Sequence, residues 1–137
     1  TVLANRLGSQ CVTVAIDFRE ESDEGWVYIK GGREKTDWRV IDWAGEVERR
    51  GAGGILLTSM NHDGTQSGFA TQITQQVCNA VSLPVIASGG AGSASDFVHL
   101  FQETDASAGL AASIFHDNRV PIPALKKRLK QQFIPVR

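Results

Sequence analysis

The hydrophobic positions of this chain fall into four short apolar runs, each followed by a polar or glycine-rich segment and then by a stretch with helical spacing. The four runs cover residues 11–17, 54–59, 84–88 and 108–113. Runs this short predict β-strands, whereas apolar residues that recur every three or four positions between them predict amphipathic helices. A strand, loop and helix repeated four times predicts a sheet of parallel strands joined by right-handed crossovers.

The clearest helical spacing lies between the first and second runs. Val40, Ala44 and Val47 recur on one face of a helix there. Glu46 and Arg50 are four positions apart, which favours an ion pair on the solvated face. The connection 18–37 is long, and the sequence GWVYIKGG within it predicts a small hairpin or flap after the first strand.

The strands carry small and polar residues on one side. Thr13, Ala15 and Asp17 share one face of the first strand, and Thr58 lies near the end of the second. This pattern fits the inside of a (β/α) barrel better than a doubly wound sheet, whose strands are almost continuously apolar. A closed barrel needs eight units and roughly 250 residues, but this chain has 137 residues. We therefore predict an α/β fold, a single (β/α)4 half-barrel domain over residues 1–137.

The composition narrows the class of protein. The chain is 42% hydrophobic with a net charge of −1, which predicts a compact domain and argues against nucleic acid or an anionic membrane as a partner. No apolar run is long enough to span a membrane, and we expect a cytoplasmic protein. Cys11 and Cys78 are expected to be buried free thiols, and with three scattered histidines they predict neither a disulfide framework nor a metal site.

Candidate chemistry gathers where the predicted strands end, because parallel α/β folds place functional groups at the carboxyl ends of their strands. Asp17 ends the first run, and its carboxylate is either a general acid or base or a turn cap. The sequence TSMNHDGTQSG, residues 58–68, follows the second run. It is either a loop that faces a substrate or a plain connection to the next helix.

The third run ends in SGGAGS, residues 88–93. Glycines allow backbone N–H groups to approach an anion closely, and the following helix is expected to offer its unpaired N-terminal amides. Ser93 and Asp96 have capping-box spacing, which marks where that helix begins. The spacing matches neither a P-loop nor a dinucleotide fingerprint, so a purely conformational role stays open. Because small residues and Ser113 end the fourth run beside it, we favour a phosphate site.

Several longer motifs resemble one known family. They are VAID, EVERRGAGGILLTSMNHDGTQSGF, LPVIASGGAG and GLAASIFH, in this order from about residue 6 to the end of the chain. Together they resemble the C-terminal half of the cyclase subunit of imidazole glycerol phosphate synthase, a histidine-biosynthesis enzyme.

The resemblance implies a (β/α)8 barrel of which this chain supplies the last four units. The family's cyclase, a lyase, adds ammonia from a glutaminase partner to a phosphorylated ribulosyl-formimino aminoimidazole carboxamide nucleotide. The products are imidazole glycerol phosphate and aminoimidazole carboxamide ribotide, and no metal or organic cofactor is expected.

The resemblance also implies residue roles. Asp17 matches one of two catalytic aspartates, a general acid or base in ring closure. Thr58, Asp63 and Gly64 match a substrate-facing loop. The residues that match a phosphate site are Ser88, Gly89, Gly90, Ala112 and Ser113.

The sequence departs from the family at two positions and in its extent. Gly54 stands where the family usually carries an acidic residue at the ammonia entrance, so docking of a glutaminase is an open question. Ala70 stands where an aspartate commonly supports the substrate loop. The second aspartate and second phosphate site belong to an N-terminal half that this sequence does not contain.

Two hypotheses follow from this incomplete site. The chain is either one part of a cyclase, inactive until a separate N-terminal half complements it, or a non-catalytic chain, namely a phosphate-binding half-barrel or a self-assembling module. Because a half-barrel has two unpaired strand edges, we expect it to pair with itself or with such a half.

Overall fold

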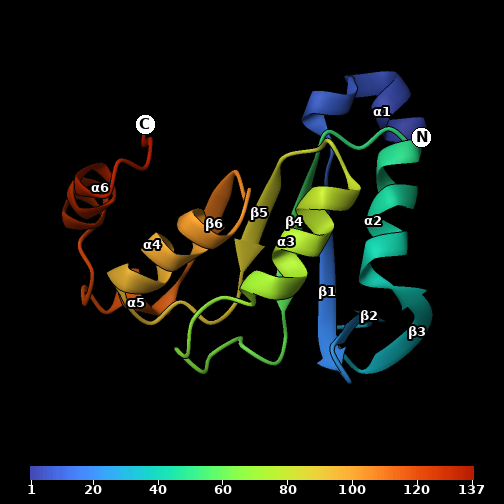
Figure 1. Cartoon of the computed structure of the whole chain (residues 1–137). Helices are drawn as coiled ribbons and strands as arrows, with labels where there is room; N and C mark the ends of the chain where they lie inside the picture. The colour runs from blue at the N-terminus through green and yellow to red at the C-terminus, as the bar shows by residue number, and fades with distance from the viewer.

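The computed structural model describes all residues, 1–137, and is organised around one six-stranded sheet in the order β3-β2-β1-β4-β5-β6 (Figure 1). The strands are β1 (Thr13–Glu21), β2 (Glu24–Ile29), β3 (Glu34–Arg39), β4 (Gly54–Ser59), β5 (Val85–Ser88) and β6 (Ala108–Leu110). Four of them, β1, β4, β5 and β6, run parallel, whereas β2 and β3 continue from β1 as an antiparallel hairpin.

Helices follow the parallel strands as the repeating pattern predicts. They are α2 (Val40–Arg49), α3 (Thr71–Ala80), α4 (Ala94–Glu103), the short α5 (Ser113–His116) and α6 (Ile122–Gln131). A short helix α1 (Val2–Leu7) and a 3-10 turn η1 (Ser9–Cys11) precede β1. None of these helices is long and apolar enough to cross a lipid bilayer.

Helices α2 to α6 lie on one face of the sheet, and the buried apolar side chains lie between the two layers (Figure 1). Ile16, Leu57 and Val85 from the strands pack in one cluster with residues of α2 and α3. A second cluster joins α4, α5 and α6, with Leu100 and Ile114 fully buried in it. Four parallel strands covered on one side by their helices form a (β/α)4 half-barrel, which confirms the predicted fold class.

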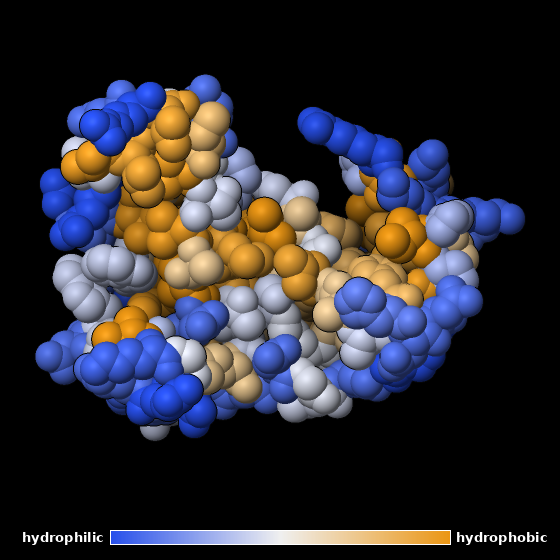
Figure 2. All heavy atoms as spheres, turned by 180° about the vertical axis from the view of Figure 1, so that it is seen from behind, coloured by the Kyte–Doolittle hydropathy of each residue, from blue (hydrophilic) through white to orange (hydrophobic).

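The opposite face of the sheet has no layer of helices over it. Thr13 and Ala15 of β1 are exposed on this face, and Leu56 and Ile86 are only half-buried. Figure 2 shows the molecule from this side as a hollow surface with a broad hydrophobic area at its centre. This face corresponds to the interior of a closed barrel.

The first strand differs from the predicted 11–17 at both ends. It begins at Thr13 because residues up to Cys11 form a 3-10 turn, and the same turn leaves the Cys11 side chain exposed. The expectation of a buried thiol at Cys11 was therefore wrong. The strand continues to Glu21 because the hairpin strand β2 pairs with it from Asp17 onward. The predicted hairpin within residues 18–37 is confirmed, and it extends the sheet.

The last strand is shorter than the predicted 108–113. Pairing with β5 ends at Leu110, and Ser113 is the first residue of α5. The helical spacing at 40–47 is confirmed, since Val40 and Ala44 are fully buried in α2. The predicted ion pair between Glu46 and Arg50 forms at 2.6 Å.

Candidate functional site

A row of residues crosses the parallel sheet near the carboxyl ends of its strands. Asp17 of β1 pairs with Thr58 of β4, and Thr58 pairs with Ser88 of β5. Since Ile16 and Phe18, the neighbours of Asp17, are buried beneath the helices, the row faces the open side of the sheet. Neighbouring strands are about 4.8 Å apart, so Asp17 and Ser88 lie roughly 10 Å from each other across the sheet.

Asp17 is not at the end of its strand, as predicted, because β1 continues beyond it. Pairing of β1 with the parallel strand β4 ends one residue after Asp17. Pairing with the antiparallel strand β2 starts at Asp17, which lies opposite Tyr28. The Asp17 side chain is half-buried and makes no hydrogen bond or ion pair within the chain. It therefore caps no turn, which removes the structural alternative weighed for this carboxylate.

A cavity of about 220 Å³ lies beside the row, between the ends of β5 and β6. Its lining includes seven of the predicted site residues: Asp63, Gly64, Ser88, Gly89, Gly90, Ala112 and Ser113. Asp17 and Thr58 do not line it. The structure thus places the residues predicted to bind phosphate around one cavity and leaves the predicted catalytic residue outside it, farther along the same face.

The glycines at the cavity have a strict conformational role. Gly89 and Gly90 adopt φ angles of +92° and +101°, a region that other residues rarely occupy. A Cβ at position 89 would lie 2.5 Å from the carbonyl oxygen of Ser59, and one at position 90 would collide with that of Gly68. The conformational role left open by the sequence is therefore present, and it brings backbone amides to the cavity.

Several of these amides have no partner within the chain. None of its hydrogen bonds uses the backbone N–H of Gly89, Gly90 or Ala91 on one side of the cavity, or of Ala112 or Ser113 on the other. Converging backbone N–H groups without partners are typical of sites that bind phosphate or another anion.

A carboxylate of the chain itself occupies two amides just before α4. The Asp96 carboxylate accepts hydrogen bonds from the backbone N–H groups of Gly92 and Ser93, both at 2.8 Å. This interaction confirms that the helix begins after Ser93. The first helical amides, those of Ala94 and Ser95, have no partner within the chain, but neither residue lines the cavity. Candidate phosphate contacts are limited to the residues before Gly92 and to the segment that leads into α5.

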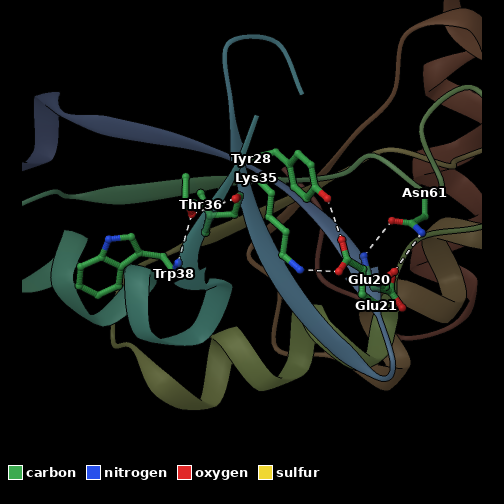
Figure 3. Close-up of polar contacts among 8 residues, drawn as sticks. Glu20, Glu21, Tyr28, Lys35, Thr36, Trp38 and Asn61 are labelled. Atoms are coloured by element: carbon green, nitrogen blue, oxygen red, sulfur yellow. Dashed lines mark hydrogen bonds and ion pairs between the residues drawn. The ribbon is translucent and has the colours of Figure 1, made fainter. Parts of the chain in front are cut away.

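The loop after β4 forms one wall of the cavity and is held from both sides. Asn61 accepts a hydrogen bond from the backbone N–H of Glu20 at 2.8 Å and donates one to its carbonyl oxygen, as Figure 3 shows. On the other side, the Arg119 guanidinium donates to Gln66 Oε1 at 2.8 Å. Gln66 lines the cavity, so this contact places a positive charge one side chain away from it.

Sequence reasoning missed Gln66 and Arg119. They are 53 positions apart, and no local pattern links them. Leu110 also lines the cavity and was not predicted, whereas Ala91 and Ala111, which line it too, lie within the segments 88–93 and 111–113 already considered. The strand-end rule identifies their neighbourhood, but small apolar residues carry no chemical signal of their own.

The hairpin beside the site has its own polar network. Tyr28 and Lys35 both donate to the Glu21 carboxylate (Figure 3), and Lys35 lies over the Trp26 ring at 4.3 Å. These contacts lower the pKa of Glu21, the Lys35 hydrogen bond most strongly and the Tyr28 hydrogen bond next. Because Glu21 is on the exposed rim of the hairpin, we assign this network to holding β1, β2 and β3 together.

The two departures from the family pattern lie outside the cavity. Gly54 is buried at the amino end of β4, opposite Thr13 and far along the strand from Thr58. Ala70 immediately precedes α3, which has no side-chain cap at its amino end. No group of three His, Cys, Asp or Glu side chains lies close enough together to hold a metal ion.

Comparison with known proteins identifies clear relatives. The model of a family described as "Histidine biosynthesis protein" matches residues 1–121. The chain is 48% identical to the imidazole glycerol phosphate synthase subunit HisF of Staphylococcus carnosus, over 98% of this chain and 54% of that subunit. It is 51% identical to HisF of Alkaliphilus metalliredigens, over 100% of this chain and 55% of the relative. The chain spans about half the length of the curated relatives it matches.

Proposed function

Because this chain belongs to the histidine biosynthesis protein family, we propose that it is the C-terminal half of a HisF-type cyclase. In this proposal it contributes one phosphate site and one catalytic carboxylate, and it turns over substrate only when an N-terminal half completes the barrel. The observation that carries the proposal is the set of backbone N–H groups without partners around the 220 Å³ cavity, on the same sheet face as Asp17.

The placement of these groups suits a long phosphorylated substrate. One phosphate of the ribulosyl-formimino aminoimidazole carboxamide nucleotide would accept hydrogen bonds from Gly89, Gly90 and Ser113, with the Ser88 and Ser113 hydroxyls nearby. From there the substrate would extend across Thr58 toward Asp17, a span of roughly 10 Å at normal strand spacing. Binding energy from the phosphate would thus hold the reacting carbon and nitrogen atoms near a carboxylate without the phosphate taking part in the reaction.

Asp17 would move a proton during ring closure. An aspartate with no partner in the chain, half-buried on an open sheet face, can accept a proton as ammonia adds and return it to the departing amine. The complementing half would bring the second carboxylate and exclude water from this face. A glutaminase is the proposed source of ammonia, although Gly54 offers no carboxylate at the predicted entrance.

A reconstitution experiment tests the catalytic proposal. The chain is mixed with the N-terminal half of a relative and an ammonium salt, and imidazole glycerol phosphate is measured. We expect product from the mixture and none from either half alone. Asp17→Asn should lower the rate about 100-fold or more, while Asp23→Asn, at the exposed β1–β2 turn, should not change it. An unchanged rate with Asp17→Asn would contradict the assignment.

The second candidate function is phosphate binding without turnover. It is favoured by the same cavity, which is formed by this chain alone. Inorganic phosphate titrated into the isolated chain should shift the amide NMR signals of Gly89, Gly90 and Ser113 and leave those of α2 in place. Such binding, together with an inactive reconstituted mixture, would support this second function over the first.

We also propose that the chain pairs with a second copy or with an N-terminal half. The outer edge of β6 has no neighbouring strand, and β1 has none on the side away from β4 along Thr13–Ile16. Unpaired edges of a parallel sheet and an uncovered apolar face both favour association. Size-exclusion chromatography with light scattering should give the mass of more than one chain, and a monomer at tens of micromolar would contradict this proposal.

A further inference from the structure

His62 occupies a central position in the loop after β4 without belonging to the cavity lining. Its Nδ1 atom lies 2.8 Å from the carbonyl oxygen of Gly68, and its Nε2 atom lies 3.6 Å from Oε1 of Glu20. The side chains of His62 and Glu20 are 30% and 31% exposed, so both are largely held within the structure. The imidazole ring therefore bridges the end of β1 and the far end of its own loop.

The contact with Gly68 fixes the protonation of one ring nitrogen. A carbonyl oxygen can only accept a hydrogen bond, so Nδ1 must carry the proton. Free histidine in its neutral form has no such constraint on its tautomer, and the choice here is set by the partner. The other nitrogen faces Glu20 Oε1, a buried atom that has no hydrogen-bond partner within the chain. The 3.6 Å contact is thus a close approach and not a hydrogen bond, because Nε2 of the neutral ring with its proton on Nδ1 cannot donate.

The bridge continues into the glycine segment of the cavity. The backbone N–H of Gly68 donates to the carbonyl oxygen of Gly90 at 2.9 Å. A Cβ at position 90 would also come within 2.9 Å of the Cβ of His62, so the two residues pack directly against each other. A continuous chain of contacts thus runs from Glu20 through His62 and Gly68 to Gly90.

This chain of contacts joins the two parts of the candidate site. Glu20 is three positions after Asp17 on the same strand, and Gly90 carries one of the amides without a partner. Asn61 reinforces the first link, because its side chain pairs with both backbone groups of Glu20 (Figure 3). We propose that His62 is a positioning residue that couples the β1 strand bearing Asp17 to the glycine segment 89–91. The structural coupling does not depend on phosphate binding. Only its expected effect on phosphate affinity rests on the phosphate site proposed above.

Three substitutions of His62 distinguish the contributions of its two ring nitrogens. In His62→Asn, the side-chain amide nitrogen takes the place of Nδ1 and keeps a donor for Gly68. In His62→Gln, the amide reaches the position of Nε2, faces Glu20 and leaves Gly68 without this bond. His62→Phe keeps the ring and loses both contacts. His99→Asn, on the exposed side of α4, is the matched control.

Two measurements on the chain without ligand test the coupling. The ¹⁵N shifts of His62 in the neutral state should show the proton on Nδ1. Hydrogen exchange of the Gly68 amide should be about three- to tenfold faster in His62→Phe and His62→Gln than in the original chain. It should stay near the original rate in His62→Asn and in the control, while amides of α3 exchange alike in all variants.

Phosphate titration supplies the functional measurement. Affinity for inorganic phosphate should fall about three- to tenfold in His62→Phe and be restored in His62→Asn. If His62→Phe exchanges like the original chain, or if the neutral ring carries its proton on Nε2, the positioning role is overturned. If the original chain binds no phosphate at all, the proposed phosphate site fails, and the exchange and tautomer measurements still decide the role of His62.

Discussion

Gly68 donates its backbone N–H to the carbonyl oxygen of Gly90 at 2.9 Å, and this bond ties the loop after β4 to the loop after β5. The two loops would otherwise be separate connections on neighbouring strands. Because they are joined, Asp63 and Gly64 from one and Gly89 from the other line a single cavity. The close approach depends on the missing side chain at position 90.

Replacement of Gly90 tests this dependence. Gly90→Ala combines a φ of +101° with a collision against the Gly68 carbonyl, so the free energy of unfolding should fall by about 3 kcal/mol or more. Gly31→Ala is the matched control, since Gly31 has a φ of +66° but open space around it. This variant should lower the free energy of unfolding by about 1 kcal/mol. Urea unfolding measures both, and equal losses would show that the close contact is unimportant.

A polar residue at position 70 should stabilise the chain. Ala70 precedes α3 and leaves its first amides without a side-chain acceptor. Ala70→Ser supplies a hydroxyl at this position, and the free energy of unfolding should rise by about 0.5–1 kcal/mol. Ala80→Ser, at the exposed last residue of α3, has no amide to cap and should give no gain. A gain at position 80 and none at position 70 would contradict the capping argument.

Glu46 should stabilise the folded chain at neutral pH, and this stabilisation should be lost in acid. Hydrogen bonds from Arg49 and then Arg50 lower the pKa of its carboxyl from 4.5 to about 2 in the folded chain. Between pH 4.5 and about pH 2 the unfolded chain binds more protons than the folded chain. The contribution of Glu46 to the free energy of unfolding is therefore complete above about pH 4.5 and disappears as the pH falls to about 2.

The measurement is the urea midpoint as a function of pH. Glu46→Gln should be less stable than the original chain near neutral pH, and the difference should shrink through the acid range and vanish by about pH 2. Glu103→Gln, at the exposed end of α4, serves as the control and should follow the original curve. A difference that stays constant across this range would mean that Glu46 acts through packing instead of charge.

The two thiols should differ in reactivity. Cys11 is exposed, whereas Cys78 is half-buried in α3, and burial, with a smaller effect of Asp105, raises the pKa of the Cys78 thiol. Since the thiolate is the reactive form, a thiol reagent at about pH 8 should label Cys11 quickly and Cys78 only after denaturation. Cys11→Ser should remove the fast phase, and a fast phase that persists in this variant would contradict the assignment.

The parallel part of the fold was predictable because its signals are local. Val40, Ala44 and Val47 reveal a buried helix face through their spacing alone, and the apolar runs at 54–59 and 84–88 match β4 and β5 closely. The end of β1 was not predictable in the same way. Its last residues, Phe18 to Glu21, are held by pairing with β2, and that pairing depends on how the hairpin folds back.

The candidate site was likewise predictable only where the signal in the sequence is local. The strand-end rule and the resemblance grouped Ser88, Gly89 and Ser113, and the three residues line one cavity. They did not show that Asp96, which has capping-box spacing, occupies the amides of Gly92 and Ser93 beside the cavity. A carboxylate that marks a helix start in the sequence is also a competing anion, and only the structure shows which amides remain.

The hairpin has a consequence for assembly. Because β2 covers the outer edge of β1 from Asp17 onward, only Thr13–Ile16 is bare, a stretch similar in length to β6, Ala108–Leu110. A strand that joins this edge can slide along it only until it meets the end of β2. The hairpin therefore limits the register of an added strand in one direction. We expect this limit to favour a closed ring and to disfavour an open series of staggered copies.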